Sequence, residues 1–350
     1  MRTGERVGGK QLATSRDVAR KAGVSQATVS RVLQGNTNVS EHKRDLVERA
    51  MADLGYRPNA AARAIRMEGS RTIGVVVADI TNPFYPQLLE AISQEMEAVG
   101  AHMVLWNSAE PGQFGVLDAV RRGLVDGLIF TTVSELNEPL AESLRRNEPV
   151  MLLHRGLDSI DCDQVTSDNE HGASMVADYL VDFGHTQIGY LQGPELAGTS
   201  IHRDRGFRSR LAELGQPLSP ELTRRANFDH TEARQAMREL MDSPIAPTAV
   251  FCANDMSAFG AIDGALSLGL RVPEDVWVVG FDDTDLASWD AYSLTTVRQP
   301  TGEMARIAVR RILERIDTHN LQPLNRKFTC NFVVRGSTAH SPYRQSGEST

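Results

Sequence analysis

The stretch GVSQATVSRVL, residues 23–33, has the spacing of a short amphipathic helix near the start of the chain. Its apolar residues recur as one face of a helix requires, and they are Val24, Val29, Val32 and Leu33. The other side is small or polar and carries Gln26, Ala27, Thr28, Ser30 and Arg31. Both an ordinary solvated helix and a helix that enters a groove of DNA have this pattern.

Helix signals on either side of the stretch predict a helix-turn-helix module over residues 14–57. The preceding helix has Thr14 or Ser15 as its N-cap candidate and Gly23 as its stop. A third helix follows Ser40 with apolar residues at helical spacing. Two short helices around a glycine-containing turn, braced by a third, are what such a module requires.

The charge is unevenly distributed along the chain. The first 70 residues carry 13 Lys and Arg against 7 Asp and Glu, whereas the remaining residues carry 24 against 38. A basic head on an acidic body predicts two parts with different partners, because only the head attracts phosphates. Basic faces also arise by chance, so charge alone is weak evidence for DNA binding.

The composition predicts a soluble globular protein of two or three domains, with 350 residues of which 41% are hydrophobic. The first residues contain no apolar run typical of an export signal, and no membrane-spanning stretch follows, so we expect a cytoplasmic protein associated with the nucleoid. Cys162, Cys252 and Cys330 lie far apart, which favours buried free thiols over disulfides. No metal site or cofactor is expected.

Residues 58–70 predict a short helix followed by a linker. Pro58 can begin a helix, and the alanines after it favour one. The segment has only about two turns, and isolated helices of fewer than about 12–15 residues are marginal in water. We therefore expect residues 58–67 to fold when the chain is dimerised on DNA.

From Thr72 onward, apolar β-branched runs alternate with helical patterns. Strands without polar alternation are covered on both faces, which predicts parallel sheets flanked by helices. The length favours two doubly wound lobes, one opening near Ile73 and the other near Gln187. Residues 1–13 and the polar tail 339–350 are predicted to be disordered.

Residues 14–338 resemble the lactose/galactose-repressor family of bacterial transcription regulators. The resemblance rests on ordered blocks that include DVARKAGVSQATVSRVL, TIGVVVADITNPFY, GHTQIGYLQG, AVFCANDMSAFGAI and RVPEDVWVVGFDDTDLASW. It implies an all-α helix-turn-helix domain, a hinge helix and an α/β body like that of periplasmic sugar-binding proteins. Within the body (71–338), lobe one takes about 71–170 plus 300–328 and lobe two about 172–297 plus 329–338.

The resemblance assigns base reading to Gln26, Ala27 and Arg31. Gln can pair with adenine, Arg with guanine, and Ala can meet a thymine methyl group. Thr14, Ser25, Thr28 and Ser30 suit phosphate contacts or helix capping, and Thr37, Asn59 and Arg63 complete the expected DNA-binding set. Ile65 stands where the family has a leucine wedged into the minor groove, although it can instead pack against the body.

Polar and aromatic residues that follow strands are expected to bind the effector, because ligands of open α/β sheets bind beyond the carboxyl ends of the strands; they include Phe84, Tyr85, Asn254 and Asp282. The resemblance implies four further effector-binding positions, which are His154, Thr199, Arg203 in HRDRGF, and Phe228. An arginine and an aspartate facing a hydroxylated ligand both make charge-assisted hydrogen bonds, and aromatic faces cover a sugar ring or a base. His154 replaces an acidic residue that the family often has.

Five of these residues also have a structural alternative. Tyr85 or Phe228 can belong to the core, Asn254 can cap the next helix, Asp282 can cap the next turn, and Arg203 can form a salt bridge between the lobes. The sequence leaves these alternatives open.

Other classes of protein fit less well. An exported sugar receptor needs an export signal and has no use for a basic head. An enzyme is not expected either, because GxGxxG after the first strand, a P-loop and GxSxG are all missing. A homodimer on a palindromic double-stranded operator is expected, since one helix-turn-helix reads one half-site. The effector, a sugar or similar small molecule, can act as inducer or co-repressor.

Overall fold

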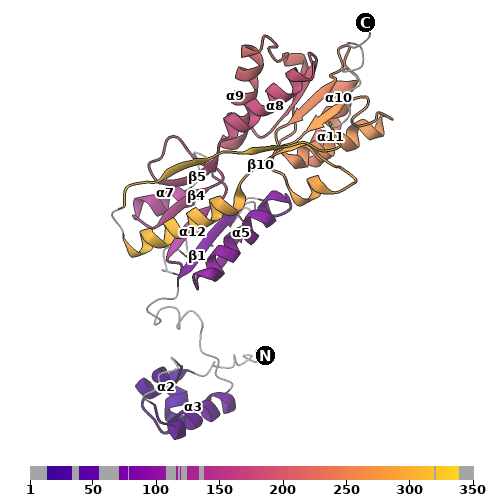
Figure 1. Cartoon of the computed structure of the whole chain (residues 1–350). Coiled ribbons are helices and arrows are strands. Elements are labelled where there is room, and N and C mark those ends of the chain that lie inside the picture. The colour runs from indigo at the N-terminus through magenta and orange to yellow at the C-terminus, as the bar shows by residue number, and fades with distance from the viewer. Residues whose placement is uncertain are drawn as a thin grey trace, which may run out of the picture. The chain divides into compact units, whose positions relative to one another are not determined.

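A computed structural model describes residues 14–33, 39–54, 71–77, 79–107, 116, 119, 124–133, 138–318 and 321–338. The predictions for residues 1–13, the hinge segment 58–70 and the tail 339–350 lie outside the described residues, as do those for Thr37, Asn59, Arg63 and Ile65. Contacts divide the chain into two units, Met1–Ser70 and Arg71–Thr350 (Figure 1).

The described residues of the first unit form the helices α1 (Ser15–Ala22), α2 (Gln26–Leu33) and α3 (Glu41–Asp53). Thr14 caps α1 through a capping box with Asp17. Gly23 ends α1 at a φ of 66°, the left-handed conformation that glycine adopts without strain. The helices enclose a small core of buried residues: Val18, Ala19, Ala22, Val29, Val32, Val39, Val47 and Ala50.

The second unit begins with a six-stranded parallel sheet, which with its helices forms lobe one. Its strands are β1 (Thr72–Val77), β2 (His102–Asn107), β3 (Gly127–Phe130), β4 (Val150–Leu153), β5 (Asp163–Ser167) and β11 (Asn325–Phe328), in the order β11-β5-β4-β3-β1-β2. The parallel sheet predicted from the apolar runs is confirmed. β2 differs from the expected strand buried on both faces, because it lies at the sheet edge and is largely exposed.

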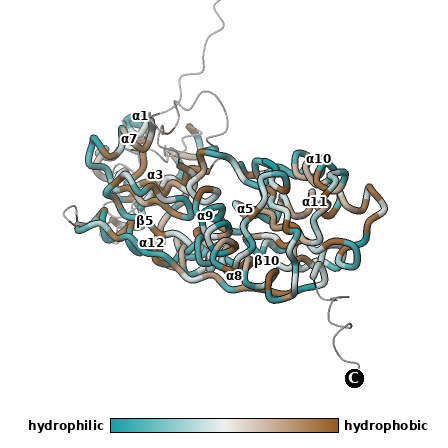
Figure 2. The backbone as a smooth tube through the Cα atoms, turned by 90° about the horizontal axis from the view of Figure 1, so that it is seen from above, coloured by the Kyte–Doolittle hydropathy of each residue, from teal (hydrophilic) through white to brown (hydrophobic). Residues whose placement is uncertain are grey.

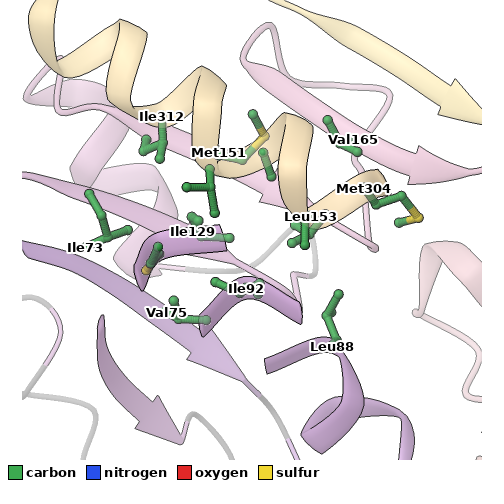
Figure 3. Packing of buried hydrophobic residues seen from close by; sticks show 14 of the residues in the cluster. Ile73, Val75, Leu88, Ile92, Ile129, Met151, Leu153, Val165, Met304 and Ile312 are labelled. Carbon is green, nitrogen blue, oxygen red and sulfur yellow. The ribbon is translucent and has the colours of Figure 1, made fainter. Parts of the chain in front are cut away.

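Helices cover both faces of the lobe-one sheet. On one face α5 (Phe84–Ala98) packs beside α12 (Thr301–Asp317), and on the other lies α7 (Glu138–Arg145). Successive residues of each strand point to opposite faces, so Val75 of β1 joins the first core and Val76 the second. Figure 3 shows the first core, in which Ile73, Val75, Ile129, Met151, Leu153 and Val165 of the strands meet Leu88, Ile92, Met304 and Ile312 of the helices.

Lobe two is built on a second parallel sheet, of four strands. They are β6 (Ile188–Gln192), β7 (Thr223–Arg225), β8 (Ala249–Cys252) and β9 (Trp277–Val279), in the order β7-β6-β8-β9. The pair α8 (Asn169–Asp182) and α9 (Gly198–Glu213) covers one face, and the pair α10 (His230–Met241) and α11 (Asp255–Ser267) covers the other. Both predicted doubly wound lobes are therefore present.

The chain passes between the lobes from β5 to α8, from β10 (Thr296–Arg298) to α12 and from β11 to β12 (Asn331–Val333). β10 and β12 pair antiparallel along these crossings (Figure 1). Ser167 Oγ donates to Gln299 Oε1 at 2.7 Å, and the amide of Asp168 donates to Phe328 O at 2.7 Å. Each crossing is thus hydrogen-bonded to another.

The three cysteines are free and buried, as the sequence predicts. Hydrophobic and hydrophilic residues alternate at short intervals along the backbone (Figure 2). Among the described helices, none combines the length and the apolar character needed to cross a membrane.

Candidate functional site

The outer side of α2 carries the three residues to which base reading was assigned. Gln26, Ala27 and Arg31 are exposed, whereas Val29 and Val32 of the same helix are buried in the core. The apolar face of α2 therefore packs on the core of the module. The exposed side is left available for a partner.

Two of the expected phosphate-contact residues also act as helix caps. Ser25 Oγ accepts from the Thr28 amide at 3.1 Å, and Thr14 Oγ1 accepts from the Asp17 amide at 3.3 Å. Gln26 Nε2 donates to Ser15 Oγ of α1 at 3.1 Å, which holds its side chain at the start of α2. Capping is thus observed for Thr14 and Ser25, while Thr28 and Ser30 are half-buried.

In the second unit, the expected effector residues all follow carboxyl ends of strands. Phe84 and Tyr85 follow β1, His154 follows β4, Thr199 and Arg203 follow β6 on α9, and Phe228, Asn254 and Asp282 follow β7, β8 and β9. Three of these residues have the left-handed backbone that side chains rarely adopt: His154 (φ 74°), Phe228 (φ 63°) and Asp282 (φ 138°). Such conformations cost energy and gather at functional sites.

Arg203 is enclosed on every side, with 1% exposure. Its Nε donates to Asn169 Oδ1 at 2.8 Å and its Nη1 to Ala253 O at 2.6 Å, while its guanidinium lies 3.7 Å from the ring centre of Phe281. Nη2 lies 3.3 Å from Asp282 Oδ1, an ion pair whose geometry makes no hydrogen bond. Burial lowers the pKa of Arg203, and Asp282 opposes that shift. Both partners belong to lobe two, so this is not the salt bridge between lobes considered above.

Asp282 connects Arg203 to the crossings. Its Oδ1 accepts from Gln299 Nε2 at 2.7 Å, and Gln299 in turn accepts from Ser167. Burial raises the pKa of Asp282 to about 7, although Arg203 opposes the shift. The Asp282 side chain is thus hydrogen-bonded to a segment that crosses between the lobes. The N-cap residue of the turn that follows is Thr284 and not Asp282.

Aromatic rings form the lobe-one side of the site. The ring centres of Phe84 and His154 are 4.2 Å apart, and those of Tyr85 and His154 are 6.1 Å apart and nearly perpendicular. Burial, followed by the charges of Arg155 and Arg203, lowers the pKa of His154 well below its usual value, so the imidazole is neutral. Tyr85 belongs to the lobe-one core, as its structural alternative expects.

Several buried polar atoms of the site have no hydrogen-bond partner among the described residues. They are Tyr85 Oη, His154 Nδ1 and Arg155 Nε of lobe one, and Thr199 Oγ1 and Arg203 Nη2 of lobe two. Since buried polar groups are nearly always paired, unpaired atoms from both lobes indicate a place for a ligand. No cluster that could hold a metal ion is found in the part of the chain that the structure describes.

Asn254 and Phe228, two further predicted effector-binding residues, make different kinds of contact. Asn254 caps α11, since its Oδ1 accepts from the Ser257 amide at 2.9 Å, which is its structural alternative. Phe228 is half-buried, with its ring centre 6.0 Å from the Arg203 guanidinium carbon. Sequence reasoning missed Arg155, Asn169 and Gln299. Arg155 is adjacent to His154, and Gln299 lies in the family-like stretch LTTVRQP, but neither signal was used. The role of Asn169 depends on where the crossings run.

The fold and these sites define a class: a helix-turn-helix module joined to a two-lobed ligand-binding body. A family model described as "Bacterial regulatory proteins, lacI family" matches residues 14–59, and one described as "Periplasmic binding protein-like domain" matches residues 177–338. The HTH-type transcriptional repressor CytR of Escherichia coli (strain K12) is 32% identical over 332 residues, covering 94% of this chain and 97% of that protein. The Ribose operon repressor of the same strain is 32% identical over 330 residues, covering 93% and 100%.

Solved structures match over the same length. The Lac repressor dimer bound to operator and the anti-inducer ONPF has a TM-score of 0.79 and 29% identity, covering 94% of this chain and 99% of that one. The complex of the transcriptional regulator CelR with cellobiose has a TM-score of 0.71 and 29% identity, covering 93% and 99%. This chain belongs to the lacI family of bacterial regulatory proteins. Its family is one of regulators, in agreement with the expectation that it is not an enzyme.

Proposed function

We propose that this protein is a cytoplasmic transcriptional repressor that binds a palindromic operator as a homodimer and responds to a hydroxylated small molecule, such as a sugar or a related metabolite. CytR and the Ribose operon repressor are named repressors. The Lac repressor structure contains a dimer on operator, and the CelR structure contains cellobiose. A repressor acts on chromosomal DNA, which supports a cytoplasmic location.

The proposed DNA contacts are the exposed residues of α2, with Gln26, Ala27 and Arg31 against base edges. In a helix-turn-helix the second helix enters the major groove with its N-terminal residues against the bases. Thr14, Ser25, Thr28 and Ser30 position the module on phosphates in this proposal. Thr37, Asn59, Arg63 and the wedge Ile65 remain predictions, as do the proposed domains, with DNA binding over 14–57, the hinge over 58–70 and the effector-binding body over 71–338.

The observation that carries the effector part is the set of unpaired buried polar atoms contributed by both lobes. We propose that a ligand accepts or donates hydrogen bonds at these atoms, with Arg203 and Asp282 on one side and Phe84, Tyr85 and His154 on the other. Thr199, Phe228 and the side-chain nitrogen of Asn254 complete the proposed contacts.

The proposed allosteric route runs through the crossings. Asp282 is hydrogen-bonded to Gln299, and Gln299 to Ser167, so a ligand that moves Asp282 also moves two of the segments that join the lobes. A change in lobe orientation would alter how the paired hinge segments of a dimer meet. Coupling of this kind is reciprocal: the operator changes ligand affinity by the factor by which the ligand changes operator affinity.

The test has two arms on the full-length protein. Selection from random double-stranded DNA is expected to yield a palindromic site, and a screen of sugars, nucleosides and polyols is expected to yield a ligand that raises the melting temperature. That ligand must then change operator affinity. Selection without any sequence preference contradicts the DNA arm, and a ligand that binds without altering operator affinity contradicts the allosteric arm.

A further inference from the structure

Ser15 and Gln26 are the first residues of α1 and α2, and their side chains are hydrogen-bonded to each other. Gln26 Nε2 donates to Ser15 Oγ at 3.1 Å, although the two residues are 11 positions apart in the sequence. Gln26 is exposed on the side of α2 that is proposed to face the bases, whereas Ser15 is half-buried. The sequence suggests only an N-cap role for Ser15, and Thr14 is the residue that caps α1. The hydroxyl of Ser15 thus contacts a proposed base-reading side chain and has no other assigned role.

The backbones at both ends of this hydrogen bond are held in place by helix caps. Thr14 caps α1 through its capping box, directly before Ser15. Ser25 Oγ accepts from the Thr28 amide at 3.1 Å, directly before Gln26. Both helices also pack on the core of the module. A glutamine side chain loses rotamer freedom when a partner immobilises it, and the bond to Ser15 supplies part of that order before DNA is bound.

The direction of the hydrogen bond determines which atoms of the Gln26 amide remain for a base. A glutamine amide has one oxygen acceptor and two N–H donors. With Nε2 on Ser15, the amide keeps Oε1 and one N–H, a pattern that matches the N6 donor and the N7 acceptor of adenine. With the amide reversed, Oε1 would accept from the serine hydroxyl, and the two remaining N–H donors would match the O6 and N7 acceptors of guanine.

We infer that Ser15 is a positioning residue for DNA recognition: its hydroxyl holds the amide of Gln26 in the orientation that reads adenine and rejects guanine. This rests on the proposed function, in which α2 enters the major groove. Ser15 acts through Gln26 and makes no base contact of its own. Without the hydroxyl the amide is free to turn over, because the terminal torsion of glutamine is broad and roughly twofold. The consequence is a broader base preference at one position of each half-site, and not an equal loss of affinity for every sequence.

The test uses the full-length protein and the operator that it selects from random double-stranded DNA, with each position then varied in turn. Gln26→Ala identifies the position that Gln26 reads, because the base preference is lost there. The wild type is expected to favour adenine over guanine at that position about tenfold or more. Ser15→Ala is expected to reduce this ratio to about threefold or less and to weaken binding to the best operator about fivefold. Ser15→Thr, which retains a hydroxyl, is expected to restore the ratio.

Two controls separate positioning from a structural role. Ser40→Ala removes a serine hydroxyl at the N-cap of α3, where the side chain makes no capping bond, and is expected to keep the wild-type preference at every position. In the Gln26→Ala background, Ser15→Ala is expected to change operator affinity by less than about twofold, since the residue through which Ser15 acts is absent. Alanine favours a helix, so the Ser15→Ala protein is expected to fold.

Three results would each overturn the inference and leave the proposed operator binding standing. The first is a Gln26→Ala protein that loses its preference at no position, and the second is a wild type that prefers a base other than adenine at the Gln26 position. The third is a Ser15→Ala protein whose ratio of adenine to guanine is unchanged, whether or not it binds all sequences more weakly. A wild type without any sequence preference would contradict the proposed function and the inference with it.

Discussion

Arg203 Nη2 lies 3.3 Å from Asp282 Oδ1, and the two side chains are only 2% and 5% exposed. Removing two charges from water costs several kcal/mol per ion, and mutual attraction repays that cost only where further hydrogen bonds satisfy both groups. Asn169, Ala253 and Gln299 supply such bonds, yet Nη2 remains without one. A buried pair that is incompletely satisfied suits a site that a ligand completes better than a purely structural contact.

Replacing Arg203 is expected to abolish the effector response and to leave operator binding near the wild-type level. Arg203→Ala removes the donors proposed for the ligand, whereas the α2 surface lies in the other unit of the chain. The substitution leaves Asp282 buried without its partner, which destabilises lobe two by about 3–5 kcal/mol at most, because the carboxyl group can take up a proton. Operator titrations with and without ligand measure the effect.

The control for Arg203→Ala is Arg210→Ala on the same helix, where the arginine pairs with Asp178 and Glu213 at the surface. It is expected to retain the full effector response, because exposed ion pairs contribute little. A loss of operator binding in Arg203→Ala, both with and without ligand, would assign Arg203 to folding and not to the ligand.

Asp282 is expected to make the stability of the body depend on pH. Its pKa in the folded state is raised from 3.8 to about 7, chiefly by burial. The folded state therefore holds a proton that the unfolded state loses, and the stability present below about pH 4 is lost as pH rises to about 7. One pKa unit corresponds to about 1.4 kcal/mol, so the loss amounts to a few kcal/mol. Urea unfolding of the wild type and Asp282→Asn between pH 4 and 8 measures the difference.

Asp275 provides a control, because its pKa is shifted in the direction opposite to that of Asp282. Hydrogen bonds from Arg271 lower its pKa to about 2, so its contribution is present above about pH 4 and is lost only at lower pH. Asp275→Asn should therefore keep the wild-type slope between pH 4 and 8, while Asp282→Asn should flatten it. Asp255, whose pKa burial raises to about 6, remains in both variants and retains part of the slope. An unchanged slope in Asp282→Asn would show that its carboxyl group ionises normally.

The sequence predicts the elements whose signals are local. The cap at Thr14, the stop at Gly23 and the apolar strands β1, β3, β4, β6 and β8 depend on residues close together in the chain. β5 and β11 were not predicted, because DQVTS and NRKF are largely polar. Asp163 in β5 is nevertheless fully buried, since Arg311 and Arg315 of α12 pair with it from a distant part of the sequence.

In the candidate effector site, too, local sequence signals could be recognised, whereas contacts between distant parts of the chain could not. Arg203 could be named because it lies in HRDRGF, which resembles a known family, and Asp282 because it follows an apolar strand within a family-like block. Asn169, which positions Arg203, lies in no such motif, and Gln299, although it lies in the family-like stretch LTTVRQP, acquires its role only where the crossings meet lobe two. The unpaired donor of Arg155 likewise follows from burial, which no local pattern encodes.

Arg31→Ala is expected to weaken operator binding by about 1–3 kcal/mol and to relax the preference at one base position, as the loss of a base-edge contact does. Arg31 is exposed on α2, so folding should be unaffected. Binding to a set of operators with each position varied in turn measures both effects. Arg146→Ala, with the same change of charge in the other unit, should bind as the wild type. An equal loss on every sequence would make Arg31 a phosphate contact.

Replacing either of two helical glycines by alanine is expected to change the stability of the protein, in opposite directions for the two positions. A Cβ at Gly206 of α9 would lie 2.2 Å from the backbone oxygen of Glu170 on α8, whereas a Cβ at Gly302 of α12 meets nothing described within 4 Å. Gly206→Ala must push α8 and α9 apart, an overpacking that costs about 1–3 kcal/mol or more. Gly302→Ala should instead stabilise the protein by about 0.5–1 kcal/mol, since alanine favours a helix.

Gly206 lies one turn from Arg203, and Arg203 Nε donates to Asn169 Oδ1 across the same helix pair. The displacement in Gly206→Ala should therefore lengthen this bond and weaken effector binding as well as stability, whereas Gly302→Ala should leave effector affinity unchanged. Urea unfolding and ligand titration of the two variants measure both quantities. A destabilised Gly206→Ala protein with wild-type effector affinity would show that the close packing of α8 on α9 maintains lobe two without positioning Arg203.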